Sequence, residues 1–274
     1  MRARLRRLGL GLATLIGPTP GGFFIPYRYA RTAAARDYPA LRPLFEAAEP
    51  RMRGVLDAVD AYADGLLRIA AGDGPARFDQ DWFPPLDAAV AYAVVRRERP
   101  TRIVEVGSGH STRFLARAVA DEGLQASITC VDPNPRASLA GLGVRHEARV
   151  LDDADRDLFD ALAPGDVLFV DSSHVAMPGT DVDRIFLDVL PRLPPGVLIH
   201  VHDVFLPGGY PHSWAWRGYN EQLLAGAFLA GGGAEILFAS AHAVARSLVP
   251  SDGVVRRLPA VPGAFASSLW LRKL

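Results

Sequence analysis

The fold of this chain is decided by one stretch of sequence, Arg102-Ile103-Val104-Glu105-Val106-Gly107-Ser108-Gly109-His110-Ser111-Thr112. It starts with an apolar run that contains one acid, and a glycine turn then leads into a helical pattern that continues to Val119. Glycine has no Cβ and accepts positive φ, so a ligand can lie against bare backbone at such a turn. The unpaired N–H groups at the start of the next helix would face the same ligand. The stretch therefore predicts a buried strand, a turn and a helix, with a nucleotide-type cofactor at the turn.

Two interpretations of this turn compete. A dinucleotide-binding fingerprint has a third glycine for close packing of helix on strand, and this chain has Thr112 at that position. A tight strand-to-helix turn without a ligand is the simpler interpretation. The next apolar run, residues 127–131, ends at Asp132, roughly 20 residues past the turn, where a ribose-binding acid is expected. Asp132 also precedes Pro133-Asn134-Pro135, so a turn or cap residue is the alternative. The order of strand, glycine turn, helix, strand and acid favours cofactor binding.

These residues resemble the motifs of the class I S-adenosylmethionine-dependent methyltransferases. Val104-Glu105-Val106-Gly107-Ser108-Gly109 is similar to the first motif of that family, and Val131-Asp132 is similar to its ribose-binding acid. The resemblance covers roughly residues 85–274 and implies S-adenosylmethionine as cofactor. It implies that Glu105, Gly107, Ser108 and Gly109 lie by the methionine and ribose parts, and that Asp132 lies on the ribose. The adenine contact is expected after the third strand, at Asp152 or Asp153, and Asp153 is the residue chosen here.

Composition sets limits on the class of protein. The chain has 274 residues, an ordinary apolar content of 49%, and thirty Lys and Arg residues against thirty Asp and Glu. This balance leaves the chain without the net positive charge that would favour nucleic-acid binding by the chain as a whole. The single Cys130 lies in an apolar run and forms no disulfide framework within one chain, which agrees with a reducing compartment. We expect a cytoplasmic protein.

The rest of the chain alternates between apolar runs and helical patterns. Apolar runs separated by helices are typical of a parallel sheet covered on both faces. We therefore expect an α/β fold with a doubly wound, mostly parallel seven-stranded sheet, the Rossmann-like fold that the resemblance implies, and an antiparallel strand at the end of the chain. The expected strands are residues 102–106, 127–131, 144–150, 166–171, 196–202, 234–239 and 267–272.

Helices are expected at residues 38–71, from Pro84-Pro85 to Arg97, and at residues 216–229. Gly72-Asp73-Gly74-Pro75 breaks the helical pattern of residues 38–71. We therefore expect two parts: an N-terminal arm with a helical cap over residues 1–80, and a methyltransferase domain over residues 81–274.

The N-terminus has arginines before an apolar run that ends at Gly17, which is the order seen in signal peptides. However, Pro18-Thr19-Pro20-Gly21-Gly22 follows in place of a small-x-small cleavage site, and the run is far shorter than the ~20 residues that span a bilayer. A basic amphipathic segment on a membrane surface is one interpretation. The simpler one, which we expect, is an arm that packs on the domain or on a partner subunit of a homo-oligomer.

Polar residues follow two of the predicted strands. Asp171 and His174 follow the run 167–170, and His202 and Asp203 follow the run 197–201. Ligands of open α/β sheets bind beyond the carboxyl ends of the strands, and neighbouring strands lie ~5 Å apart. If these two strands are neighbours, the four side chains converge at the cofactor edge, where carboxylates and imidazoles can form a divalent-metal site. Each residue alone can also be a cap or turn residue, and for the deeper His200 we expect a structural role.

This arrangement resembles the metal-dependent O-methyltransferases of the catechol and macrolide-sugar types. The resemblance implies that Asp171, His202 and Asp203 are metal ligands, that Asp171 also borders the cofactor, and that His174 is the general base. Mg²⁺ is the metal that the resemblance implies. However, His202 departs from the all-oxygen ligands that Mg²⁺ prefers, so manganese, iron or zinc are alternatives, and His202 can instead touch the substrate.

The residues after the fifth strand, 204–221, mix aromatic residues with Pro and Gly. Such a loop can fold over a substrate, or can equally bury the edge of the sheet. We expect a methyltransferase that acts on a hydroxyl of a small molecule or glycoside, assisted by a divalent metal. The alternatives are a metal-dependent hydrolase or oxygenase-like enzyme, and a non-catalytic cofactor-binding module.

Overall fold

The computed structural model describes residues 2–18 and 21–274. It contains two compact units, residues 1–35 and 36–274. The first unit holds helix α1 (Arg2–Ile16) and a short 3-10 turn at Ala30–Thr32. At the end of α1 the Thr14 hydroxyl donates to the Leu10 carbonyl and accepts the N–H of Gly21, at 2.8 and 3.1 Å. Thr19 and Pro20, part of the break expected after the apolar run, lie outside the described residues.

The second unit is built on a seven-stranded sheet with strand order β3-β2-β1-β4-β5-β7-β6. The first five strands run parallel, and β7 is antiparallel to both β5 and β6. This confirms the expected doubly wound, mostly parallel sheet. The strands are β1 (Arg102–Val106), β2 (Ser127–Val131), β3 (Arg145–Glu147), β4 (Val167–Val170), β5 (Leu198–Val201), β6 (Ala234–Ala239) and β7 (Leu269–Lys273).

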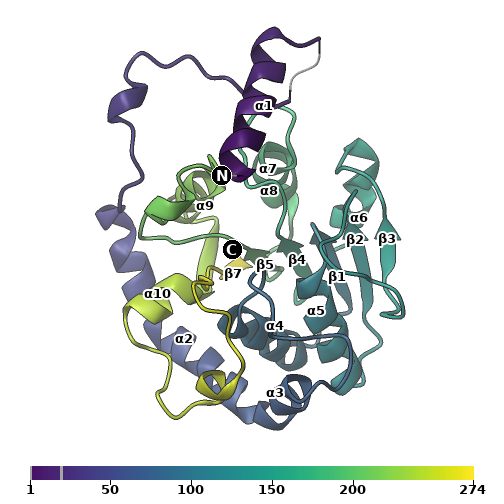
Figure 1. The fold of residues 1–274 in the computed structure, drawn as a ribbon. Helices are drawn as coiled ribbons and strands as arrows, with labels where there is room; N and C mark the ends of the chain where they lie inside the picture. Colours follow the sequence, from purple (N-terminus) through teal and green to yellow (C-terminus); the bar gives the residue numbers. More distant parts are fainter. Residues whose placement is uncertain (1, 19–20) are drawn as a thin grey trace. The chain divides into compact units, whose positions relative to one another are not determined.

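Helices cover both faces of this sheet. Figure 1 shows α4 and α5 together on one side of it, and α7, α8 and α9 on the other. The helices of the unit are α2 (Arg42–Ala61), α3 (Ala63–Ala70), α4 (Pro85–Glu98), α5 (His110–Asp121), α6 (Arg156–Asp160), α7 (Asp181–Arg184), α8 (Leu190–Arg192), α9 (Glu221–Ala230) and α10 (Ser240–Ala245). A π-helical turn, Ile185–Val189, joins α7 to α8.

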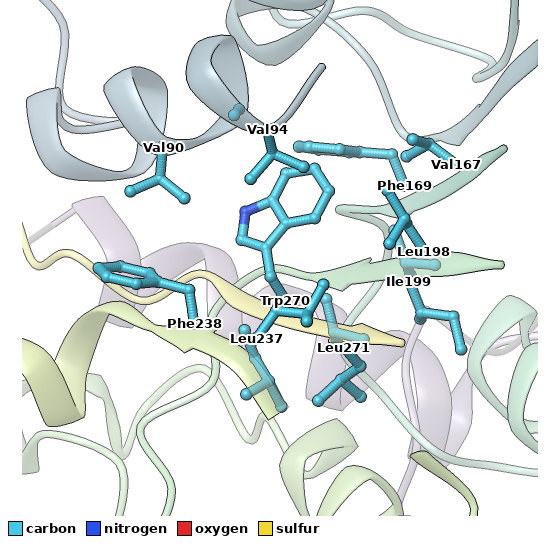
Figure 2. Close-up of a cluster of buried hydrophobic side chains, with 14 of the residues drawn as sticks. Val90, Val94, Val167, Phe169, Leu198, Ile199, Leu237, Phe238, Trp270 and Leu271 are labelled. Atoms are coloured by element: carbon cyan, nitrogen blue, oxygen red, sulfur yellow. The ribbon is translucent and has the colours of Figure 1, made fainter. Parts of the chain in front are cut away.

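The core lies between α4 and the centre of the sheet. Every residue of α4 from Pro85 to Val95 is buried, as expected of a helix with neighbours on all sides. Figure 2 shows the Trp270 side chain of β7 beside Val94 of α4, with Phe169 of β4 close by. Trp270 is fully buried and meets the Phe169 ring edge-on at 5.8 Å. Truncating such a side chain to alanine lowers the free energy of unfolding by about 3–5 kcal/mol. The packing of Trp270 against α4 therefore helps to hold this helix on the sheet, below the ends of the strands.

The register of the parallel strands brings four strand ends to one level. Val106 of β1 pairs with Val131 of β2 and with Val170 of β4, and Val170 pairs with Val201 of β5. β4 and β5 are therefore neighbours, which was the condition for the predicted cluster. The residues that follow these four strands all leave the sheet at the same edge.

Two expected elements differ from the structure, and a third is confirmed but divided in two. The third strand is shorter than residues 144–150, because the chain turns after Glu147, where the N–H of Arg149 donates to the Glu147 carbonyl. The helix expected from Trp216 starts only at Glu221, because Gly218 adopts a φ of +71° and breaks the helical path. The helical region 38–71 is confirmed as two main helices, α2 and α3, which meet at Tyr62.

Helix α2 packs against α4 and β6, so it belongs to the same compact unit as the sheet. The domain boundary at residue 80 stays a prediction. Within the described residues, no helix is long and apolar enough to cross a membrane.

Candidate active site

The glycine turn after β1 is shaped by the approach of other parts of the chain. Gly107 has a φ of +80°, and a Cβ there would lie 1.8 Å from the carbonyl oxygen of Asp171. Gly109 has a φ of +148°, and its Cβ would lie 2.9 Å from the Cβ of Arg136. Only glycine fits at these two positions, because the backbone has a positive φ and because a side chain would collide with the neighbouring atoms. The turn brings the exit of β1 into direct contact with the exit of β4.

Glu105 lies inside the protein just below this turn. It is fully buried, and its two carboxylate oxygens accept the hydroxyls of Ser111 and Thr112, each at 2.6 Å. Burial raises the pKa of Glu105 to about 7, although these hydroxyls and the Cys130 thiol oppose the rise. The Thr112 hydroxyl also accepts the N–H of Gly109 at 2.9 Å. Thr112, which stands where a dinucleotide fingerprint has glycine, therefore ties the helix start to both the turn and the strand.

Asp132 occupies the exit of β2, beside the glycine turn. One carboxylate oxygen accepts the N–H and the hydroxyl of Ser108, at 2.6 and 3.0 Å. The other accepts the N–H of Asn134 at 2.7 Å. The structure therefore brings Asp132 and Ser108 together, as a shared cofactor site requires, and it also gives Asp132 the turn-capping role that was its alternative.

The residues expected near the adenine lie after β3. The Asp153 side chain is 96% exposed and forms an ion pair with Arg184. Asp152 accepts the N–H of Ala154 at 2.8 Å and so caps the next turn. The sequence interpretation did not single out Asp155, which is the buried acid of this segment and binds Arg149 through both carboxylate oxygens, each at 2.6 Å. Asp153 is thus a surface residue.

At the exits of β4 and β5 the four predicted polar side chains form one cluster. The His174 Nε2 lies 3.4 Å from an oxygen of Asp171 and 3.5 Å from one of Asp203. The His202 Nδ1 lies 3.3 Å from Asp171 and 3.4 Å from Asp203. The two imidazoles therefore alternate with the two carboxylates, and the sequence prediction that these four side chains converge is matched by the geometry.

The charges of this cluster stabilise one another. Burial alone would lower the pKa of each histidine, but the neighbouring carboxylates raise the pKa of both His174 and His202 well above the usual value. Burial would likewise raise the pKa of Asp171, whereas the two histidines hold it well below its usual range. Their mutual attraction therefore favours the imidazolium form of both histidines and the carboxylate form of Asp171.

His174 is held by residues that the sequence interpretation did not connect with it. Its Nδ1 lies 2.9 Å from an oxygen of Glu221, the first residue of α9, and both side chains are buried. The His174 carbonyl accepts the N–H groups of Asn220 and Glu221, and the Asn220 side chain accepts the N–H of Ala176 at 2.6 Å. These contacts hold the loop after β4 against the start of α9 and leave the His174 Nε2 facing the carboxylates.

His202 and Asp203 are held in a similar way. The His202 Nε2 lies 3.3 Å from Asp87 of α4, which is fully buried and also accepts the N–H groups of Ser267 and Ser268. The Ser267 hydroxyl donates to Asp203 at 3.1 Å. Among the described residues, four that are not glycine have a positive φ, and two of them are His174 and Asp203. Such backbone conformations are uncommon outside glycine and gather at functional sites.

His200 has the structural surroundings expected for it. Its ring stacks on Phe169 at 3.7 Å, and its Nε2 lies 2.8 Å from the Ser268 hydroxyl. Burial and the charge of His202 hold its pKa well below the usual value. It is therefore neutral and packed within the sheet.

A pocket of about 140 Å³ opens beside His202 and Asp203. Its volume is close to the ~150 Å³ that accommodates benzene in an engineered cavity. The guanidinium of Arg217 lies 4.1 Å above the Trp214 ring, and its Nη1 lies 3.9 Å from an oxygen of Asp203. Besides these four residues, the pocket is lined by Asp81, Trp82, Pro262, Gly263, Ala264 and Phe265. The aromatic loop after β5 thus contributes directly to this pocket, together with segments before β1 and before β7.

Sequence reasoning found the four cluster residues because they follow directly on apolar strands. It missed Asp87, Glu221 and Ser267, which come from distant segments and carry no local signal. It also expected a metal site. Among the residues that the structure describes, no group of three or more His, Cys, Asp and Glu side chains is arranged to hold a metal ion.

Comparison with known proteins agrees with this geometry. Residues 104–204, from β1 to just past β5, match a family described as a methyltransferase domain. No curated protein matches the chain significantly.

Three solved structures illustrate what the chain is similar to. An O-methyltransferase from Bacillus cereus in complex with S-adenosylhomocysteine has 15% identity and a TM-score of 0.43, over 78% of this chain and 90% of that one. The methyltransferase PaMTH1 from Podospora anserina, also bound to S-adenosylhomocysteine, has 17% identity and a TM-score of 0.40, over 92% and 99%. A branched-chain polyamine synthase from Thermus thermophilus has 17% identity and a TM-score of 0.44, over 78% and 64%.

The parallel sheet, the glycine turn and the acids at the strand ends give the chain the Rossmann-like fold that was expected from its sequence. The family match over residues 104–204 confirms the resemblance to the class I S-adenosylmethionine-dependent methyltransferases that the motifs around Glu105 and Asp132 indicated.

Proposed function

We propose that this protein transfers the methyl group of S-adenosylmethionine to a hydroxyl of a small molecule or glycoside. The observation that carries this proposal is the cluster of Asp171, His174, His202 and Asp203, which borders both the glycine turn and the pocket of about 140 Å³. The turn and Asp132 would bind the cofactor, and the pocket would admit the ring that carries the hydroxyl. The cofactor and the acceptor would then meet at one edge of the sheet, as ligands of open α/β sheets do.

In this proposal His174 is the general base. The acceptor oxygen attacks the methyl carbon, the bond from that carbon to sulfur breaks with its electron pair moving to sulfur, and the hydroxyl proton passes to the His174 Nε2. For this step His174 must first release the proton that its raised pKa favours. The positive sulfonium at the same edge would promote that release by lowering the pKa of His174, because like charges disfavour the protonated form. Glu221 is a positioning residue, since its carboxylate on Nδ1 fixes the ring with Nε2 facing Asp171 and Asp203, where the acceptor hydroxyl would lie. Such base catalysis typically contributes 10²–10⁴-fold to the rate.

A divalent metal is a separate part of the proposal. Asp171, His202 and Asp203 are the residues that would hold it, and a bound metal would lower the pKa of the acceptor hydroxyl. Two carboxylates and an imidazole have suitable donor chemistry, and Asp87 on the far nitrogen of His202 resembles the carboxylates that orient metal-binding histidines. The arrangement itself does not fit, because the imidazole nitrogens face the carboxylates at ion-pair distances and the described residues have no metal-binding geometry. These side chains would have to rearrange around a metal.

The cofactor part is tested by calorimetric titration of S-adenosylhomocysteine into the full chain. We expect saturable binding, and no heat of binding at millimolar ligand would overturn the proposal. The reaction is tested by incubation with radiolabelled S-adenosylmethionine and a panel of catechols, phenols and glycosides, beside a matched panel of amines. Label transferred to hydroxyl oxygen supports the proposal, and label found only on nitrogen contradicts it.

The metal part is tested with the acceptor that this panel identifies. The protein is first treated with a chelator, and Mg²⁺ or Mn²⁺ is then added back while turnover is measured. If a metal takes part, turnover falls at least tenfold with the chelator and returns with the ion. Unchanged turnover in metal-free buffer would contradict a role for a metal, and His174 would still be the proposed general base.

A further inference from the structure

The first unit, residues 1–35, has a composition unlike that of the rest of the chain. It contains no Asp, Glu or Lys, and its charge comes entirely from Arg2, Arg4, Arg6, Arg7, Arg28 and Arg31. The whole chain has thirty residues of each sign, so the remainder is correspondingly acidic. The unit is therefore a strongly cationic segment on a protein with no net charge.

Helix α1 carries an apolar stripe on one face. Leu5, Leu8, Leu12 and Leu15 follow one another at steps of three and four residues, which places them on one side of a helix with 3.6 residues per turn. Their exposed fractions are 61%, 60%, 48% and 57%. Leucines in a stripe are normally covered, so this face is suited to contact with an apolar surface.

A second exposed apolar segment follows the helix. Phe23, Phe24 and Ile25 have exposed fractions of 60–63%, and Tyr27 and Tyr29 are each 57% exposed. The two tyrosine rings meet edge-on at 5.9 Å, and the guanidinium of Arg28 lies 5.8 Å from the centre of the Tyr29 ring. Aromatic side chains interleaved with arginine are suited to the boundary between lipid headgroups and acyl chains.

We propose that residues 2–35 dock the protein on an anionic lipid surface. The leucine stripe and the aromatic segment would enter the boundary of the acyl chains, and the arginines would bind the headgroups. The 15 residues of α1 measure about 22 Å at 1.5 Å per residue, less than the ~30 Å of a hydrocarbon core, so the helix lies on the bilayer and does not cross it.

Charge argues against a second copy of this unit as the occupant of the leucine stripe. A second copy of the unit would bring arginines against arginines, because the unit has no acid to pair with them. An anionic bilayer offers both the negative charge and the apolar depth that the unit requires.

The experiment is flotation of the full chain with vesicles of 70% phosphatidylcholine and 30% phosphatidylglycerol, beside vesicles of phosphatidylcholine alone. We expect binding to the anionic vesicles, at least tenfold weaker binding to the neutral ones, and weakening in 0.5 M salt. The double substitution Leu8→Gln, Leu12→Gln should weaken binding by about tenfold or more, because it removes two apolar side chains from the boundary of the acyl chains. Leu10→Gln, on the opposite face of α1, is the matched control and should change binding less than twofold.

Absence of binding to the anionic vesicles, or equal binding by the double variant and the parent chain, would overturn the proposal. So would size-exclusion chromatography that shows a dimer for the parent chain and a monomer for the double variant, because a second copy would then cover the stripe. S-adenosylhomocysteine binding, measured on every variant, confirms that residues 36–274 stay folded. The outcome is independent of whether the protein methylates a hydroxyl.

Discussion

The two halves of the site are built in different ways. At the exits of β1 and β2 the side-chain contacts join residues at most 25 positions apart: Glu105 binds residues six, seven and 25 positions away, and Asp132 binds residues 24 and 2 positions away. At the exits of β4 and β5 the partners are distant. His174 and Glu221 are 47 residues apart, Asp203 and Ser267 are 64 apart, and His202 and Asp87 are 115 apart.

The two halves also differ in how they handle charge. In the cofactor half, Glu105 meets only hydroxyls and a thiol, so burial raises its pKa to about 7. In the acceptor half, Asp171 meets imidazoles, and its pKa is held well below the usual range. The difference teaches that the first half holds its buried acid with neutral donors, whereas the second half concentrates charge.

The largest expected effect concerns the acceptor half. The substitution His174→Ala should lower turnover about 10²–10⁴-fold, since it removes the general base, and should change S-adenosylhomocysteine affinity less than twofold. Initial rates with the acceptor found in the panel measure the first, and calorimetry measures the second. His212→Ala removes an exposed imidazole from the nearby loop and serves as the control. Full turnover by the His174 variant would refute the assignment of the base.

The second prediction concerns charge in the cofactor half. The folded pKa of Glu105 is about 7, above the ordinary 4.5, so the folded state holds this proton more tightly than the unfolded state. The contribution of Glu105 to stability is complete below about pH 4.5 and is lost as the pH rises through 7, by about 3 kcal/mol in total. Urea unfolding at pH 5 and pH 8 should show this loss in the parent chain and a smaller one in Glu105→Gln. Equal pH dependence in both would contradict the prediction.

The third prediction separates cofactor binding from turnover. Asp132→Asn should weaken S-adenosylhomocysteine binding about 10–100-fold, because hydrogen bonds to a charged acceptor contribute 1.5–3 kcal/mol. Turnover at saturating S-adenosylmethionine should fall much less. The substitution His174→Ala should show the opposite pattern, with lower turnover and unchanged affinity for S-adenosylhomocysteine. A variant with unchanged affinity would mean that Asp132 only caps its own turn.

The fourth prediction tests the long-range contact at His174. Glu221→Gln should lower kcat about tenfold, because a neutral amide replaces a charged hydrogen-bond partner, while KM for both substrates stays unchanged. Glu221→Ala should lower kcat further, since the ring then loses its partner altogether. Glu235→Gln, a carboxylate-to-amide change on β6, is the matched control. An increase in KM with unchanged kcat would show that Glu221 does not act through His174.

The smallest effect is expected at Asp153. If it contacts the adenine from the rim of the site, Asp153→Ala should weaken S-adenosylhomocysteine binding only about two- to threefold, since an exposed hydrogen bond contributes at the low end of 0.5–1.5 kcal/mol. Affinity identical to that of the parent chain, measured by calorimetry, would assign the adenine contact to another residue.

The difference between the two halves also explains what the sequence could predict. The strands, the glycine turn and the acids at the strand ends are local features, so apolar runs and their last residues located them. The convergence of His174 with Asp203 followed from the general rule for neighbouring parallel strands. The partners Asp87 and Glu221 were beyond prediction, because their roles depend on where distant helices dock. The helix expected from Trp216 was wrong at its start, because one glycine conformation outweighed the helical pattern.

The position of β7 has a consequence for how the protein is made. β7 follows β6 along the chain but lies between β5 and β6 in the sheet, and the residues just before it, Ser267 and Ser268, donate to Asp87. During synthesis, β6 therefore leaves the ribosome before β7, the strand that joins it to the sheet. Asp87 is synthesised about 180 residues before the backbone groups that donate to it. The acceptor half is thus assembled late in synthesis, when β7 inserts, whereas the cofactor half is complete once β4 has emerged.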